Sequence, residues 1–342
     1  MPCFKTQFSN LTSLRFLDLS CANLVADLSS ISISLTLPPK MDFGSMFSFI
    51  RYGELSSPNL SWLEGLRGLR YLVLTGVDLS KASESFHWAK PISTLSNLMT
   101  LQLSKCKISG RIPTGQLLNL TKLSTLEMIS NVLTSPIPDL LSNLTSISVL
   151  DFSGNDLHGH IPYLPQLEKL NVSINPAMTI DLVSMFSVPW SKLTFLDISF
   201  ARVGGTIPPP LSNSTSSTFF RADRCSIQGS VPSSVTKLEK LSILMLNDND
   251  ITEIVTKGLT HWLESVSSYN TGFDVSSNAL TGKIPEKIGL LSGIPLQNLS
   301  HNNLTGVIPK TIGEMISPES LDLSYNHFTC EVPLTLTLLD LL

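Results

Sequence analysis

Apolar and polar residues alternate in short segments that recur along the chain about every 24 residues. In residues 150–157, Leu150 and Phe152 lie on either side of Asp151, and Asn155 and Leu157 follow. The same pattern returns at 126–133, 196–203, 244–251, 273–280 and 321–328. A two-residue alternation is typical of a strand with one buried face, and one short strand cannot bury that face alone. The pattern therefore predicts a solenoid in which successive coils stack their strands in parallel.

One position of this frame, directly after the strand, carries an amide that we expect to be buried. An amide has two donors and an acceptor, so it can bind the backbone of adjacent coils. Cys106 and Cys225 occupy the same position, and we interpret them as structural rather than redox-active, since a buried cysteine is a small residue and a weak donor. Small residues occupy it at Ala22, Val77 and Ala201, and asparagine does so at Asn131, Asn155, Asn175, Asn249, Asn278, Asn302 and Asn326.

A second motif, Gly-x-Ile-Pro or a close variant, follows most of the strands. Examples begin at Gly110, Gly159, Gly229 and Gly306. Glycine permits a tight turn, the aliphatic residue points into the core, and proline fixes an extended exit. Apolar residues then recur at three-residue spacing, as in 117–123. This spacing predicts a short 3₁₀ or helical turn on the convex side of each coil.

Composition argues against several classes of function. The formal net charge is −4, and Lys and Arg form no run longer than two, so nothing indicates nucleic-acid binding. The five cysteines form no C-x-x-C pair, and no hydrolase, metalloprotease, P-loop or kinase motif is present. His158 and His160 flank a turn and are expected to be solvated. We therefore expect no enzyme activity, no metal and no cofactor.

The frame breaks in two places and is unfinished at the end. The sequence predicts repeats over 1–251 with an irregular insertion near 24–65, an irregular segment at 252–271, further repeats over 272–333, and the start of an incomplete repeat at 334–342. The amino-terminal residues lack the apolar core of a secretory signal, and no stretch of about 18 apolar residues suggests a membrane span.

The consensus L-x-x-L-x-L-S-x-N-x-L-T-G-x-I-P resembles the plant-specific class of leucine-rich repeat. It is similar to the ectodomains of plant receptor-like kinases, receptor-like proteins and polygalacturonase inhibitors. Residues 62–92 and 255–333 resemble receptor-like proteins in particular. The resemblance implies an α/β leucine-rich-repeat solenoid, a curved right-handed superhelix with a parallel sheet on its concave face.

The same resemblance implies perception of an extracellular peptide, protein or glycan at the plasma membrane, in defence or development, through a partner kinase. Residues 252–271 resemble the end of the family's island segment. Lys257 and Gly258 match its pattern and would contact a co-receptor kinase of the SERK type; a plain surface loop is the alternative. The chain lacks the family's signal peptide, caps, membrane span and tail, so we expect a truncated member.

The concave face is the candidate binding surface, because side chains between the core leucines point out of the sheet. Exposed aromatics beside arginines are the usual anchors of an interface. The alternative is that the phenylalanines pack on one another and cover the sheet. The expected set is Lys169, Asn171, Phe195, Asp197, Phe200, Phe219, Arg221, Asp223, Arg224, Met245 and Asp248.

The chain has eight N-x-S/T sequons, at Asn10, Asn59, Asn119, Asn143, Asn171, Asn213, Asn298 and Asn303. Asn171 and Asn298 fall in predicted strands, so we expect glycans at Asn119, Asn143 and Asn213. Three hypotheses follow: the ligand-recognition part of a receptor-like protein, a soluble apoplastic protein like the polygalacturonase inhibitors, and a non-functional truncated paralogue.

Overall fold

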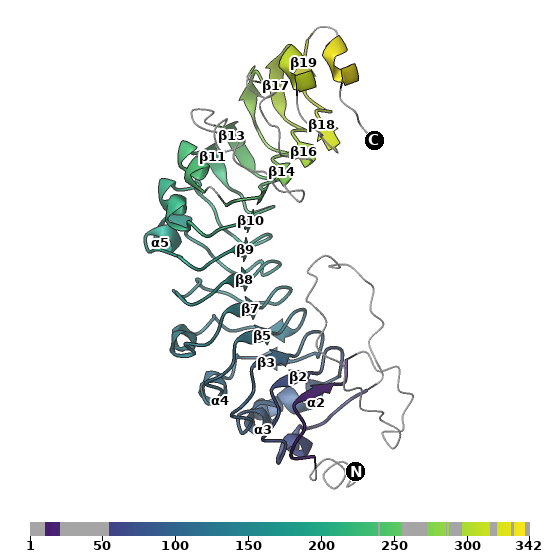
Figure 1. The fold of residues 1–342 in the computed structure, drawn as a ribbon, viewed down its shortest axis with the longest axis vertical. Helices are drawn as coiled ribbons and strands as arrows, with labels where there is room; N and C mark the ends of the chain where they lie inside the picture. The colour runs from purple at the N-terminus through teal and green to yellow at the C-terminus, as the bar shows by residue number, and fades with distance from the viewer. Residues whose placement is uncertain are drawn as a thin grey trace. The chain divides into compact units, whose positions relative to one another are not determined.

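The computed structural model describes residues 11–20, 55–238, 240–254, 272–284, 286, 296–314, 320–329 and 332–338. The chain divides into two compact units, Met1–Leu157 and His158–Leu342. Each is built from coils of one short strand, a turn and a return segment (Figure 1). The predicted solenoid of parallel strands is confirmed.

The first unit contains a parallel sheet in which strands far apart in sequence lie side by side. Its order is β1 (Phe16–Asp18), β2 (Tyr71–Val73), β3 (Thr100–Gln102), β5 (Thr125–Glu127) and β7 (Val149–Asp151). The return segments contain η2 (Ser61–Leu63), α2 (Ser80–Ser83), η3 (Glu84–Phe86), α3 (Ala89–Ile92), α4 (Thr114–Leu117) and η4 (Asp139–Asn143). In Figure 1, α3 and α4 lie to one side of the stacked strands.

The second unit repeats the same plan. Its sheet contains β8 (Lys169–Asn171), β9 (Phe195–Asp197), β10 (Phe219–Arg221), β12 (Ile243–Met245), β14 (Gly272–Asp274), β16 (Leu296–Asn298) and β18 (Ser320–Asp322). Its helical turns are α5 (Leu182–Phe186), η5 (Pro209–Asn213), η6 (Ser233–Lys237), η8 (Lys310–Glu314) and η9 (Leu334–Leu338).

The Gly-x-Ile-Pro segments build smaller parallel sheets on the flank of the coils. These contain β4 (Ser109–Gly110) with β6 (Val132–Leu133), β11 (Gln228–Val231) with β13 (Asp250–Ile254), and β15 (Thr281–Gly282), β17 (Asn303–Gly306) and β19 (His327–Phe328). Gly229 has a φ of +75°, and a Cβ placed there would come within 3.0 Å of the Thr206 side chain. Glycine is therefore required at this turn both for its backbone conformation and for space.

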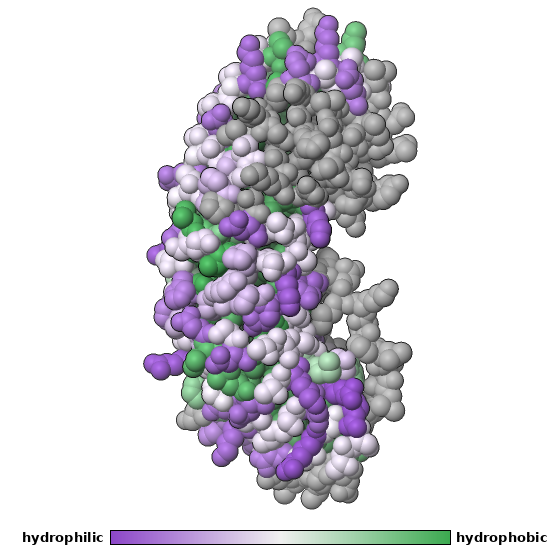
Figure 2. All heavy atoms as spheres, turned by 60° about the vertical axis from the view of Figure 1, so that its left-hand side comes forward, coloured by the Kyte–Doolittle hydropathy of each residue, from purple (hydrophilic) through white to green (hydrophobic). Residues whose placement is uncertain are grey.

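The core consists of the leucines of the repeat frame. Leu126, Leu150, Leu196 and Leu244, each the middle residue of its strand, are at most 1% exposed. Gln297 occupies this position in β16, in register with Phe273 and Leu321, and is itself 2% exposed. On the face drawn in Figure 2, hydrophobic residues reach the surface in small patches with hydrophilic residues between them.

The buried asparagines hold neighbouring coils together, as the sequence predicts. Asn131 Oδ1 accepts hydrogen bonds from the backbone N–H groups of Cys106 and Ile108, both at 3.0 Å. Its Nδ2 donates to the carbonyl oxygens of Leu103 at 2.8 Å and Met128 at 3.0 Å. One side chain thus satisfies backbone groups of two coils that lie one repeat apart.

The two cysteines at this position are also structural. Cys106 Sγ donates to the Leu74 carbonyl oxygen at 3.0 Å, and Cys225 Sγ to the Ile198 carbonyl oxygen at 3.2 Å. Both are fully buried, and burial raises the pKa of each thiol to about 12. The reactive thiolate is therefore suppressed at neutral pH.

The residue immediately before the asparagine position adopts a left-handed backbone. Phe200, Arg224 and Asp248 have φ values of 61°, 53° and 55°. Such a conformation is costly for a bulky residue and persists only where surrounding contacts enforce it. The side chains of this series stand at the carboxyl end of the strands, one in each coil.

The structure bears on the predicted irregular segments only in part. Residues 24–54 and 255–271, which include Lys257 and Gly258, lie outside the described residues. Within the predicted insertion, the described residues 55–65 contain the 3₁₀ turn η2, and Leu60 and Leu63 are fully buried. Among the described residues, no helix has the length and apolar character needed to cross a membrane.

We predict that Asn131→Ala lowers the free energy of unfolding by about 3 kcal/mol, because several buried backbone groups lose their partner. Urea denaturation of protein produced without glycans measures this. Asn143→Ala, which removes an exposed amide, is the matched control and should have little effect. A loss below about 1 kcal/mol for Asn131→Ala would show that the coils do not depend on the amide.

Candidate concave binding surface

Two of the three phenylalanines of the expected surface pack on one another. Phe195 and Phe219 are in register across β9 and β10, and their rings stack with centroids 4.3 Å apart and an interplanar angle of 14°. Both are half-buried. They therefore cover the sheet, as the alternative interpretation expected, while part of each ring stays accessible. Lys169, also half-buried, is in register with Phe195 on β8.

A group of charged residues follows two positions further along the same strands. Arg221 is in register with Asp197 on one side and Met245 on the other. Its Nε donates to Oδ2 of Asp223, which is only 1% exposed. The side chains of Arg221 and Met245 are half-buried. This pair of opposite charges is largely removed from water.

Asp197, like Asn171 and Asp223, is an expected surface residue that the structure buries. It is 1% exposed rather than displayed, and its Oδ1 accepts a hydrogen bond from the Ser199 N–H at 3.0 Å. Asn171, at the same position of β8, is also buried and accepts from the Ser173 N–H. These short polar side chains fold back and accept hydrogen bonds from their own backbone.

Burial and the neighbouring charges shift the pKa values of this group. Burial raises the pKa of both Asp197 and Asp223 above the ordinary aspartate value, although Arg221 acts against this. For Arg221, burial lowers the pKa, but the hydrogen bond to Asp223 and the fields of Asp223, Asp197 and Asp274 outweigh it and raise the pKa. The arginine is therefore held in a strongly negative environment.

The remaining expected residues lie after the strands, in the left-handed series. Arg224 places its guanidinium 5.2 Å from the centroid of the Phe200 ring, and its Nε donates to Asp248 Oδ2 at 3.0 Å. Phe200 is 38% exposed, and Arg224 is exposed. A row of aromatic, cationic and anionic groups thus lines the edge of the sheet, open to solvent.

A cavity that the sequence interpretation missed lies in the second unit. It has a volume of about 870 Å³ and a floor of buried apolar side chains, among them Ile180, Met185 and Trp190. Tyr163 packs edge-on against Trp190, with ring centroids 5.4 Å apart. The asparagine positions 155 and 175 are only 20 residues apart, and the segment between them has no helical turn. The following coil has α5 at this level, so the short repeat leaves a hollow beside it.

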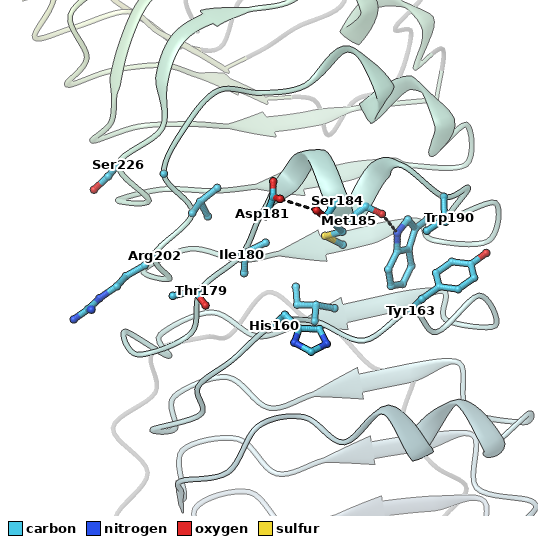
Figure 3. A pocket seen from close by; sticks show the side chains of 14 residues that line it. His160, Tyr163, Thr179, Ile180, Asp181, Ser184, Met185, Trp190, Arg202 and Ser226 are labelled. Carbon is cyan, nitrogen blue, oxygen red and sulfur yellow. Dashed lines mark hydrogen bonds between the residues drawn. The ribbon is translucent and has the colours of Figure 1, made fainter.

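The polar groups at the rim of this cavity are already engaged or turned away. Asp181 caps α5, accepting from the Val183 N–H at 2.9 Å and from Ser184 Oγ at 2.6 Å. Figure 3 shows Arg202 pointing away from the other labelled side chains. In the part of the chain that the structure describes, no three His, Cys, Asp or Glu side chains gather as a metal site would require. The concave surface therefore offers the richer set of binding groups.

We predict a coupling of about 1 kcal/mol between Phe195 and Phe219 in the free energy of unfolding, because their stacked rings add to the apolar area they bury. A double-mutant cycle with Phe195→Leu and Phe219→Leu, followed by urea denaturation, measures it. The same cycle on Phe195 and Tyr163, which the structure does not stack together, is the control. Strictly additive losses for the stacked pair would contradict this packing.

Comparison with known proteins places these features in context. The Leucine Rich Repeat family model matches residues 298–315. The chain is 30% identical to Cuscuta receptor 1 of Solanum lycopersicum over 81% of its own length and 26% of that protein. It is 30% identical to Receptor-like protein 35 of Arabidopsis thaliana over 70% of its length and 25% of that protein.

Solved structures show the same architecture. A TDR receptor superposes with a TM-score of 0.68 at 25% identity, over 82% of this chain and 47% of that one. The plant peptide hormone receptor RGFR1, solved in complex with RGF2, gives a TM-score of 0.67 at 25% identity, over 81% and 47%. The chain spans about a quarter of the length of these two curated relatives. It is a leucine-rich-repeat protein related to plant receptor-like proteins.

Proposed function

We propose that this chain is the extracellular ligand-recognition part of a plant receptor-like protein. It binds a peptide, or an extended segment of a protein or glycan, along its concave sheet and signals through a partner kinase in defence or development. The observation that supports this most directly is the row of Phe200, Arg224 and Asp248 beside the Phe195–Phe219 stack. Aromatic and arginine side chains supply most of the binding energy at protein interfaces.

The geometry of the sheet suits an extended ligand. Parallel strands display one side chain per coil in straight rows, and adjacent strands lie about 4.8 Å apart. A peptide lying across the strands can therefore contact one displayed group of each successive coil. The relative RGFR1 was solved with the peptide hormone RGF2, and this also favours a peptide.

The proposal extends to partner and location through family resemblance. The partner is a co-receptor kinase of the SERK type that contacts the segment containing Lys257 and Gly258, and the protein functions at the outer face of the plasma membrane. The alternatives are a soluble inhibitor resembling the polygalacturonase inhibitors and a non-functional paralogue. Ligand capture by the concave face separates the binding hypotheses from the non-functional one.

We expect the chain to select peptides from a phage-displayed library of random 12-residue sequences, and Met245→Trp to weaken their binding at least tenfold. The indole would obstruct the concave sheet at a half-buried position of β12. The control is Leu140→Trp on the helical turn η4, where the leucine is already 55% exposed, and it should leave affinity unchanged. Peptides that are indifferent to Met245→Trp, or no selection at all, would overturn the proposal.

We predict that secreted protein carries glycans at Asn119, Asn143 and Asn213 but not at Asn171. Asn143 and Asn213 are exposed on the helical turns η4 and η5, and Asn119 is exposed just after α4, so glycans there leave the concave face open. Asn171 is 8% exposed, and its Oδ1 accepts from Ser173 N–H and Oγ. Glycopeptide mass spectrometry of protein from plant cells reports occupancy, and a glycan on Asn171 would place sugar on the proposed binding face.

A further inference from the structure

The coil of β10 departs from a polar pair that several other coils share. In those coils an aspartate or asparagine ends the strand and accepts a hydrogen bond from the serine two residues later. Asp197 with Ser199 at 3.0 Å, Asp274 with Ser276 at 2.9 Å and Asn298 with Ser300 at 3.1 Å are examples. In β10 a cation, Arg221, stands at the first position and an acid, Asp223, at the second.

This reversal leaves a buried acceptor without a donor. Asp223 Oδ2 takes the Nε–H of Arg221, and the backbone N–H of Asp223 donates to Ser199 Oγ at 3.1 Å. Oδ1 receives no hydrogen bond from any residue that the structure describes, although Asp223 is 1% exposed. A buried carboxylate oxygen without a donor costs folding free energy. Serine, the residue at this position in the coils of β9, β14 and β16, would avoid that cost.

The charges around Asp223 favour a second cation. Asp197 lies in register beside Arg221, and Asp274 lies two strands further along, in register with Met245. All three carboxylates act on the same guanidinium. Arg224 is directed to Asp248 and Phe200 instead. Asp197 and Asp223 thus lie beside Arg221, and Asp274 lies two strands away.

An apolar platform adjoins the acidic group. The Phe195–Phe219 stack lies two residues before Asp197 and Arg221 in the same two strands, about 7 Å away at the usual rise per strand residue, and Asp223 follows Arg221 just beyond the end of β10. About 7 Å is the spacing between side chains two residues apart, on the same face of an extended peptide. A ligand could therefore place an apolar side chain on the rings and a cationic one at the carboxylates.

We propose that Asp223 receives a lysine or arginine side chain of a peptide ligand, which donates to Oδ1 while an apolar residue two positions away in the ligand packs on Phe195 and Phe219. This rests on the proposed function and narrows it to basic peptides. An ammonium or guanidinium group supplies the N–H donor that Oδ1 lacks, and a charge-assisted hydrogen bond in a site with little water is among the stronger polar contacts.

The test compares peptides selected by the wild-type chain and by Asp223→Ser from the same phage library. We expect wild-type selection to enrich lysine or arginine two residues from an aromatic or aliphatic residue, and Asp223→Ser to lose the basic preference. Asp250→Asn removes the same charge from the exposed flank strand β13 and is the matched control. It should select the same basic peptides as the wild type.

One selected peptide is then measured together with its Lys→Gln analogue. We expect the analogue to bind the wild type about tenfold more weakly and to bind Asp223→Ser as weakly as the parent peptide does, because the contact is already absent. Equal losses on both proteins would overturn the inference. The melting temperature of Asp223→Ser should not fall, since serine occupies this position in the coils of β9, β14 and β16; a clear fall would show that the carboxylate is structural and would also overturn the inference.

The outcomes separate this inference from the broader proposal. Peptides that lose affinity with Met245→Trp but carry no basic residue would refute the role of Asp223 and leave concave-face binding intact. Peptides that keep their affinity with Met245→Trp would refute both.

Discussion

The buried amide after each strand is the constraint on which the rest of the structure depends. Asn131 joins the backbone of two coils through both its oxygen and its nitrogen, and Asn249 and Asn302 do the same in the second unit. An acceptor and two donors must all be met in a core that excludes water, so neither the register of the coils nor the turn after the strand can shift by one residue. The same requirement forces the preceding residue into a left-handed conformation. The positions of the side chains at the edge of the sheet therefore depend on the buried amide. Phe200 and Arg224 have a strained backbone conformation, which the surrounding hydrogen bonds maintain.

The sequence predicted the parts of the structure that one repeat determines by itself. Strand positions, the Gly-x-Ile-Pro turn, the role of Asn131 and the burial of Cys106 all follow from the 24-residue frame, because each coil meets the same neighbours in the same way. Features that depend on which side chains meet across coils were not accessible. To predict the stacking of Phe195 on Phe219 and the burial of Asp197, one must know which residues lie one repeat away. The cavity floored by Trp190 had a signal in the short 155–175 interval, but only the position of α5 in the next coil turns that interval into a hollow.

Departures from the frame differ in what they cost the fold. Cys225 replaces the asparagine without leaving its surroundings unsatisfied, because its thiol still donates to the Ile198 carbonyl oxygen and Asn249 Oδ1 accepts from its N–H. Gln297 replaces a core leucine, and the structure buries it in the same register. The Asp223 substitution is different in kind. It places a charge where a small hydroxyl suffices, and it leaves one oxygen without a donor among the described residues.

A solenoid makes such a cost informative. Each coil contacts only its neighbours, so an unfavourable residue in one coil is not required by any distant part of the fold and can be replaced without changing the rest. Natural proteins keep a residue that the local fold disfavours mainly at functional positions. Arg221 and Asp223 break the rule together, and their coil also carries Phe219 and Arg224, the aromatic and cationic groups of the candidate surface. The energetic disadvantage and the displayed binding groups thus coincide in one coil, and this coincidence favours ligand recognition over packing as the reason for the reversed pair.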